Sequence, residues 1–283
     1  MKLHNYIGKK GFTVHKNECT QTELYEIRSA MTMKPNASMP GMVSQVSYPI
    51  YRESSSKIYL PRYYGIDTYG IPEKNLLQTG KLIDCVFEGS LFDYQLNIVQ
   101  KYIDHVGESG GGLLDVEPGK GKTVMALYII SKLAKKTLVV VHKSFLLNQW
   151  KERIQQFIPA AKIGIIQGQT CDIEGKDIVI GMLQTLCTRK FSDEVIQQFG
   201  LSVYDECHHL SAEVFCNCMV QIVTNYNLGL SGTMTRKDGL TKVFKYFIGP
   251  VVHKEKTDNN TQVLIKSYLF EDPENEEYNE VER

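Results

Sequence analysis

A glycine- and lysine-rich turn shortly after an apolar stretch constrains this chain more than any other feature. The turn runs from Gly119 to Thr123 with the sequence GKGKT, and the apolar pair Leu113 and Leu114 precedes it. Glycines let backbone N–H groups approach an anion without obstruction by a side chain. A helix that begins near Lys122 would point its positive end at the same anion. We therefore expect a phosphate-binding turn between a strand and a helix.

A pair of carboxylates ends a second apolar stretch. Asp205 and Glu206 follow residues 201–204 (LSVY) directly and precede Cys207 and His208. Buried carboxylates are costly unless they have partners, so an apolar strand that ends in two acids indicates that the charges are used. Together with the turn, they predict a site for a nucleoside triphosphate and Mg²⁺.

Each side chain of these two strings has an expected role. Lys122 would reach the β- and γ-phosphates, and Glu206 would act as the general base on the attacking water. Mg²⁺ would be held by the Thr123 hydroxyl and, through water, by Asp205. The catalytic residues are thus Glu206, Asp205 and Lys122, and the nucleotide-binding residues of the loop are Val116, Glu117, Pro118, Gly119, Lys120, Gly121, Lys122 and Thr123. Val116 stands where the generic pattern has a glycine.

Composition and charge exclude several classes of protein. No apolar run reaches the roughly 20 residues of a membrane span, and the first residues lack an apolar signal core, so we expect a soluble intracellular protein without membrane contact. The net charge is zero, but residues 271–283 sum to −6 and the rest to +6, which permits nucleic-acid binding. The seven cysteines indicate free thiols. A zinc site is a weaker alternative, because the sequence has no paired C-x-x-C. The possible ligands would be Cys207, His208, His209, Cys216 and Cys218.

The chain divides into three regions. Residues 1–88 have mixed polarity and predict a small α+β accessory domain, with a helix over 22–31 and a hairpin that pairs 48–51 with 57–60. The interpretation we favour is a brace; a nucleic-acid-sensing module is the alternative, because exposed tyrosines could stack on bases. The tyrosines concerned are Tyr51, Tyr59, Tyr63 and Tyr64. Residues 269–283 resemble a solvated acidic linker.

Residues 89–268 alternate strands with helices. Strands that are apolar on both faces and separated by helical stretches predict an α/β fold with a parallel sheet covered on both faces. We expect the strands at 113–114, 138–141, 162–166, 178–180, 201–204 and 228–231, and helices at 123–136 and 145–157. In such sheets ligands bind at the carboxyl ends of strands, where both motifs lie. Trp150 is expected to be helix core.

Six motifs in order resemble the first motor lobe of a superfamily 2 helicase or translocase. Besides the loop and the acidic pair, which has the DECH form of the DEAD-type box, four strings match: residues 91–95 (LFDYQ), 141–150 (VHKSFLLNQW), 181–186 (GMLQTL) and 229–233 (GLSGT). Residues 236–240 and 247–251 resemble the XPB-like and UvsW-like branch, which large-DNA-virus helicases share. The resemblance covers residues 89–255 and implies a RecA-like P-loop domain.

The resemblance also assigns roles outside the loop. Gln95 would contact adenine, and the nucleic-acid backbone would be held by Lys143, Ser144, Gln184, Thr185 and Arg236. Coupling between hydrolysis and strand movement would involve His208, Ser231, Gly232 and Thr233. Gly232 stands where the motif has alanine, a small-for-small difference.

The resemblance implies an ATP-dependent, Mg²⁺-requiring helicase or translocase, with DNA favoured over RNA. Motors of this class need a second RecA-like lobe that supplies arginines, so residues 1–283 alone are expected to hydrolyse ATP very slowly. Three alternatives stay open: an RNA helicase, the motor subunit of a restriction complex, and a non-enzymatic nucleic-acid-binding module with a vestigial nucleotide site.

Overall fold

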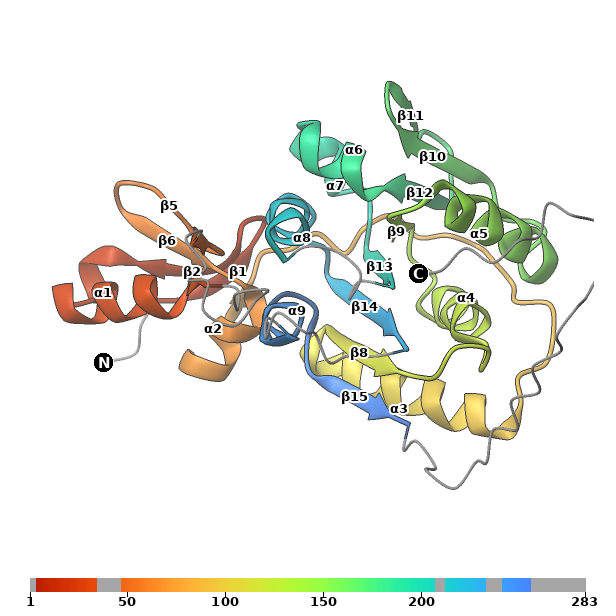
Figure 1. Ribbon diagram of the computed structural model, residues 1–283, viewed down its shortest axis with the longest axis horizontal. Coiled ribbons are helices and arrows are strands. Elements are labelled where there is room, and N and C mark those ends of the chain that lie inside the picture. The colour runs from red at the N-terminus through yellow and green to blue at the C-terminus, as the bar shows by residue number, and fades with distance from the viewer. Residues whose placement is uncertain (1–3, 35–46, 207–211, 233–240, 256–283) are drawn as a thin grey trace, which may run out of the picture.

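An eight-stranded sheet forms the centre of the computed structural model, which describes residues 4–34, 47–206, 212–232 and 241–255 (Figure 1). Its strand order is β11-β10-β12-β9-β13-β14-β8-β15, and all pairs are parallel except β10 with the edge strand β11. The bounds are β8 Gly111–Asp115, β9 Thr137–Val141, β10 Ile163–Gln167, β11 Thr170–Asp172, β12 Ile178–Met182, β13 Leu201–Asp205, β14 Tyr226–Ser231 and β15 Val251–Lys254.

Helices cover both faces of this sheet. They are α3 (Asp93–Ser109), α4 (Lys122–Leu133), α5 (Ser144–Phe157), α6 (Leu183–Thr188), α7 (Asp193–Ile196), α8 (Ala212–Met219) and α9 (Thr241–Ile248). Successive residues of one strand enter different cores, because side chains alternate across a strand: Val139 and Val141 pack with α3, α4 and α5, whereas Leu138 and Val140 pack on the opposite face. The predicted parallel α/β fold is therefore confirmed.

A smaller five-stranded sheet precedes this fold, in the order β5-β6-β2-β1-β7. Its strands are β1 Tyr6–Gly8, β2 Gly11–His15, β5 Arg52–Glu53, β6 Lys57–Leu60 and β7 Lys74–Asn75, and the region also holds η1 Lys16–Glu18, α1 Gln21–Ala30, β3 Thr32–Met33, β4 Tyr48–Pro49 and α2 Arg62–Tyr69. The predicted helix is present, but the predicted hairpin is wrong. The segment 48–49 pairs with β3, and β6 pairs with the closer strand β5, because a short turn at 54–56 closes that hairpin.

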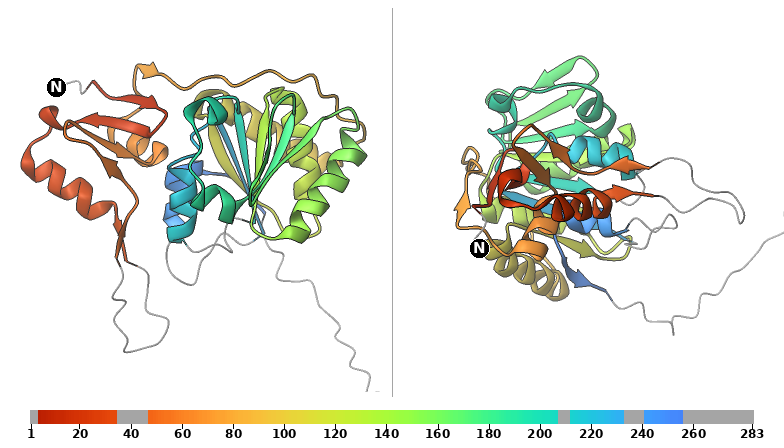
Figure 2. Two further views of the ribbon diagram at one scale, coloured as in Figure 1. Left: turned by 90° about the horizontal axis from the view of Figure 1, so that it is seen from above. Right: turned by 90° about the vertical axis from the view of Figure 1, so that its left-hand side faces the viewer.

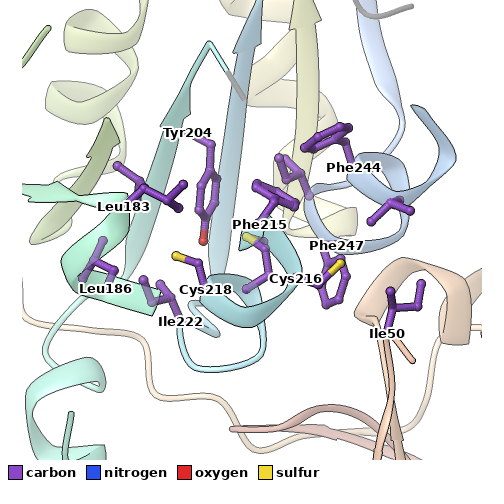
Figure 3. Close-up of a cluster of buried hydrophobic side chains, with 14 of the residues drawn as sticks. Ile50, Leu183, Leu186, Tyr204, Phe215, Cys216, Cys218, Ile222, Phe244 and Phe247 are labelled. Carbon is purple, nitrogen blue, oxygen red and sulfur yellow. The ribbon is translucent and has the colours of Figure 1, made fainter. Parts of the chain in front are cut away.

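The two sheets are joined by direct packing. The buried Arg62 guanidinium donates to the Asn225 carbonyl oxygen at 2.8 Å, and the Tyr64 and Tyr246 rings meet edge to face at 5.2 Å. Figure 3 shows the core around Tyr204 and Phe215 continuing toward Ile50 of the N-terminal region. Of the four tyrosines considered for base stacking, Tyr63 is buried, and Tyr51 and Tyr64 pack against this core. These three side chains therefore take part in packing.

A linker crosses the amino edge of the large sheet before α3 begins (Figure 2, left). Its backbone donates from Lys81 to Gln198 O at 2.8 Å and from Ile83 to Ala134 O at 3.1 Å, and Lys136 N donates back to Lys81 O at 2.8 Å. The Lys136 side chain is 1% exposed, and its ammonium donates to Ile173 O at 2.6 Å and Gln198 Oε1 at 2.8 Å. This lysine therefore ties the strand edge to its neighbouring loops.

Replacing Lys136 by methionine should lower the free energy of unfolding by about 1–3 kcal/mol at neutral pH, because two oxygens lose their donor. Burial lowers the pKa of Lys136, and the charge of Lys81 adds to this effect. The charges of Glu174 and Asp177 raise the pKa but do not cancel the effect of burial. Between the folded-state pKa of Lys136 and its unfolded value of 10.5, this side chain binds more protons in the unfolded chain, so its own contribution to stability rises with pH there.

The deficit of Lys136→Met should therefore widen in urea unfolding as the pH rises toward 10.5. Lys132→Met, at an exposed position of α4, serves as the control and should show no such trend. A deficit that shrinks with rising pH would contradict this account.

Candidate nucleotide site

Three neighbouring strands bring the two predicted motifs to one edge of the large sheet. The order β13-β14-β8 places β14 between the acidic strand and the strand that leads into the loop. The parallel registers pair Asp205 with Leu230 and Ser231 with Asp115, so all three strands end at the same level. The carboxyl ends of parallel strands are where α/β proteins bind ligands.

The loop between β8 and α4 is fixed at its base and open at its tip. Val116 N donates to Ser231 O at 2.9 Å, whereas residues 118–120 are exposed. Gly119 and Gly121 have φ values of 82° and 81°, in the left-handed region that favours glycine. The helix α4 then begins at Lys122, which directs its first N–H groups toward the loop.

Lys122 connects the loop with the acidic strand. Its side chain is 9% exposed, and its Nζ lies 3.1 Å from Glu206 Oε1 and 3.3 Å from Val116 O. Glu206 itself has φ 49°, which for a residue other than glycine costs on the order of 1–2 kcal/mol. Such strain is found at functional sites, where the surrounding structure holds it.

Asp205 is buried beside this ion pair. Its Oδ2 accepts a hydrogen bond from Trp150 Nε1 at 2.8 Å. Burial raises the pKa of Asp205, and the charge of Glu206 adds to this, whereas the Trp150 hydrogen bond and the Lys122 charge oppose it. Trp150 is thus buried as expected, but it also has a polar partner that the sequence did not indicate.

The side chain of Gln95 braces the loop from α3. Its Nε2 donates to Lys120 O at 2.9 Å, and its Oε1 accepts from Phe92 N at 3.0 Å, ahead of the first turn of α3. The Tyr94 hydroxyl also donates to Lys120 O, at 3.1 Å. Phe92 and Tyr94 stack at 5.9 Å and are both exposed, which leaves an aromatic surface beside the loop.

A further acid, which the sequence analysis missed, contacts the loop from the residue that follows β15. Glu255 Oε2 accepts from Glu117 N at 3.1 Å, and its Oε1 lies 3.7 Å from Lys120 Nζ. Glu255 N donates to Asp115 O at 2.9 Å, so the pairing of β15 with β8 brings it there. No local sequence signal reveals such a contact, because it joins segments far apart in the chain.

Gly232, at the end of β14, lies against the loop lysine. A Cβ at this position would lie 3.0 Å from both Lys122 Nζ and Pro118 Cδ. An alanine here would therefore require the Lys122 ammonium and the Pro118 ring to shift by a few tenths of an ångström. Ser231 is fully buried, and the other expected coupling residues, His208 and Thr233, lie outside the described residues.

The expected nucleic-acid contacts lie at the ends of two other strands on the same edge. Lys143 and Ser144 are exposed after β9, and Gln184 is exposed after β12, where its Nε2 donates to His142 O at 2.9 Å. Thr185 is buried, and its hydroxyl accepts from Gly168 N at 2.9 Å, which makes it part of the local packing. Arg236 lies outside the described residues.

The residues present fit a nucleoside triphosphate with Mg²⁺. The left-handed glycines and the start of α4 leave backbone N–H groups accessible to phosphate oxygens, and Lys122 supplies a positive charge. The Thr123 hydroxyl and the Asp205 carboxylate are oxygen donors, the type that Mg²⁺ prefers. The described residues include no cluster of three His, Cys, Asp or Glu that could hold a metal. Cys216 and Cys218 are buried in α8, while the other residues of the zinc alternative lie outside the description.

Replacing Gln95 by alanine should lower the free energy of unfolding by about 1–2 kcal/mol, because Lys120 O and Phe92 N each lose a partner. Gln100→Ala on the same helix removes an exposed bond to Asp104 and should cost no more than about 0.5 kcal/mol. Urea unfolding of both variants tests this difference, and equal losses would contradict the bracing role.

The chain is similar to several proteins whose names describe helicases or translocases. A family model described as type III restriction enzyme, res subunit, matches residues 88–236. Protein L396 of Acanthamoeba polyphaga mimivirus, whose name places it among ATP-dependent RNA helicases, is 33% identical over 269 residues, which cover 93% of this chain and 52% of that protein. The DNA 3'-5' translocase XPB2 of Sulfurisphaera tokodaii is 31% identical over 178 residues, which cover 63% of this chain and 38% of that protein.

The chain thus spans about half the length, or less, of the curated relatives it matches. Among solved structures, the UvsW helicase from bacteriophage T4 matches with a TM-score of 0.61 at 14% identity, over 89% of this chain and 99% of that chain, which shows a shared fold. No helix in the described segments is long and apolar enough to cross a membrane. The chain belongs to the family of the type III restriction enzyme res subunit, among the superfamily 2 helicases and translocases, and its large sheet has the RecA-like fold.

Proposed function

We propose that this chain is the ATP-binding part of a nucleic-acid helicase or translocase that couples ATP hydrolysis to movement along DNA. The observation that carries the proposal is the position of Lys122 Nζ, 3.1 Å from Glu206 Oε1, at the edge where the loop and the acidic strand end together. A lysine that follows a glycine-rich loop and faces a strand-end acid is the arrangement that triphosphate hydrolysis requires.

Each residue of the site has a separate role in ATP hydrolysis. The N–H groups of the loop and of the first turn of α4 hold the phosphates, and Lys122 exchanges its contact with Glu206 for phosphate oxygens. Glu206 would then orient the attacking water and accept its proton. Thr123 and Asp205 would hold Mg²⁺, which supplies positive charge to the phosphate oxygens. Phe92 and Tyr94 supply the exposed surface for the base, and Gln95 holds the loop beside them.

The nucleic acid along which the motor moves would bind beside this site, at the same edge of the sheet. Lys143 and Ser144 hold phosphates without recognising bases, which suits a motor that moves over any sequence. DNA is our proposal, supported by the XPB2 relative, whose name describes a DNA translocase. The name of the mimivirus relative supports RNA as the second candidate, and the family description supports a restriction-type motor subunit as the third.

In a form that carries a second lobe, replacing Glu206 by glutamine should reduce turnover by about 10²-fold or more while ATP still binds, because only the general base is lost. Lys122→Ala should weaken ATP binding by about 10-fold or more, because a charged contact to phosphate disappears. Steady-state ATPase assays and titration with a fluorescent ATP analogue distinguish these effects. Glu152→Gln and Lys132→Ala, at exposed positions of α5 and α4, are the matched controls. An active Glu206→Gln form would refute the assigned base.

We further propose that turnover needs a second lobe, because an arginine supplied across such a site is worth roughly 10³–10⁵ in rate. Residues 1–283 should bind the ATP analogue yet hydrolyse ATP near background, whereas a form that carries a second lobe should be stimulated more by duplex or single-stranded DNA than by RNA. Stimulation by RNA alone would favour the second candidate. Robust stimulated turnover by residues 1–283 would refute the need for another lobe, and no binding of the analogue would favour a vestigial site.

A further inference from the structure

The single tryptophan of the chain lies where the hydrophobic core meets the acidic strand. Trp150 lies in the second turn of α5 and is 1% exposed, in the core that also holds Leu146, Leu147 and Ile154. A buried indole N–H normally needs an acceptor. Here the acceptor is the Asp205 carboxylate at 2.8 Å, on the strand that ends at the nucleotide site.

Packing alone explains the burial of this side chain but not the choice of acceptor. Asp205 is 7% exposed, and a buried carboxylate is costly unless hydrogen bonds stabilise it. The nearby ammonium of Lys122 forms its ion pair with Glu206. The indole is therefore a donor that stabilises the Asp205 carboxylate and fixes its rotation without adding a positive charge.

A neutral donor has a specific advantage at a cation site. A lysine or arginine bound to Asp205 would repel Mg²⁺ and reduce the negative charge available to it. An indole N–H leaves the full charge of the carboxylate in place and restricts only its orientation. Replacing a group that orients a metal ligand in this way typically costs about 10- to 100-fold in metal affinity or activity.

We propose that Trp150 is a positioning residue for the Mg²⁺ site, which it supports by holding the Asp205 carboxylate in the orientation that the metal and its water require. This inference rests on the proposed function, since it assumes that Asp205 serves Mg²⁺. The family resemblance assigned the segment that contains Trp150 to nucleic-acid contact, so α5 would serve both sites: Ser144 begins the helix, and Trp150 reaches the metal side.

The test measures how much Mg²⁺ tightens the binding of a fluorescent ADP analogue, methylanthraniloyl-ADP, to residues 1–283. In the wild type, affinity should be higher with Mg²⁺ than with EDTA. Trp150→Phe keeps an aromatic ring but removes the donor, so the Mg²⁺-dependent gain should fall by about 10-fold. The affinity in EDTA should stay within about 2-fold, because the loop and Lys122 are untouched.

Two further variants test whether a loss of folding, and not the loss of the donor, explains a smaller Mg²⁺-dependent gain. Benzothienylalanine at position 150 replaces the N–H by sulfur with almost no change in shape, and it should lose the gain as Trp150→Phe does. Tyr102→Phe removes another buried bond in the same core, from the hydroxyl to Asn227 O at 2.8 Å, and should keep the full gain.

The outcomes separate this inference from the proposed function. A wild-type gain that survives in both Trp150 variants overturns the positioning role and leaves the proposed function standing. The absence of any gain in the wild type overturns the proposed function and this inference with it. A loss in both Trp150 variants but not in Tyr102→Phe supports the role.

Discussion

The parallel register of β13, β14 and β8 is the constraint on which the rest of the site depends. It ends three strands at one level, so that Asp205, Ser231 and the loop after Asp115 become neighbours although they are far apart in the chain. The hydrogen bond from Val116 N to Ser231 O at 2.9 Å then fixes the base of the loop, and the ion pair of Lys122 with Glu206 closes the gap between the two motifs. A shift of one residue in either pairing would turn these side chains to the opposite face of the sheet.

The opposite edge of the sheet is fixed by different means. The linker before α3 crosses it, and Lys136 ties the adjacent loops together, while Arg62 and the core around Phe215 hold the N-terminal region against α8 and α9. One edge is thus closed by backbone bonds and packing, while the other carries charged, partly exposed groups. This division leaves the loop tip accessible without weakening the sheet that positions it.

The sequence predicted what depends on local pattern. Wholly apolar strands such as 138–141, the helix after the loop and the two charged strings follow from periodicity and from residue type, and the structure has all of them. It could not predict contacts that only the fold creates. The indole N–H of Trp150 meets Asp205, and Glu255 reaches the loop, because strands distant in sequence lie side by side. The hairpin near residue 54 was predicted wrongly because the apolar pattern indicated 48–51 as the partner of β6, whereas the charged pair Arg52–Glu53, which the shorter loop brings closer, forms that strand.

The central claim is that the loop and the acidic strand form one site for a nucleoside triphosphate. A crystal structure of residues 1–283 with a non-hydrolysable ATP analogue and Mg²⁺ tests it most directly. The account predicts phosphates against Gly119 to Thr123, Lys122 withdrawn from Glu206, and a metal ion between Thr123 and Asp205. Nucleotide bound elsewhere, with the Lys122–Glu206 pair intact, would contradict it.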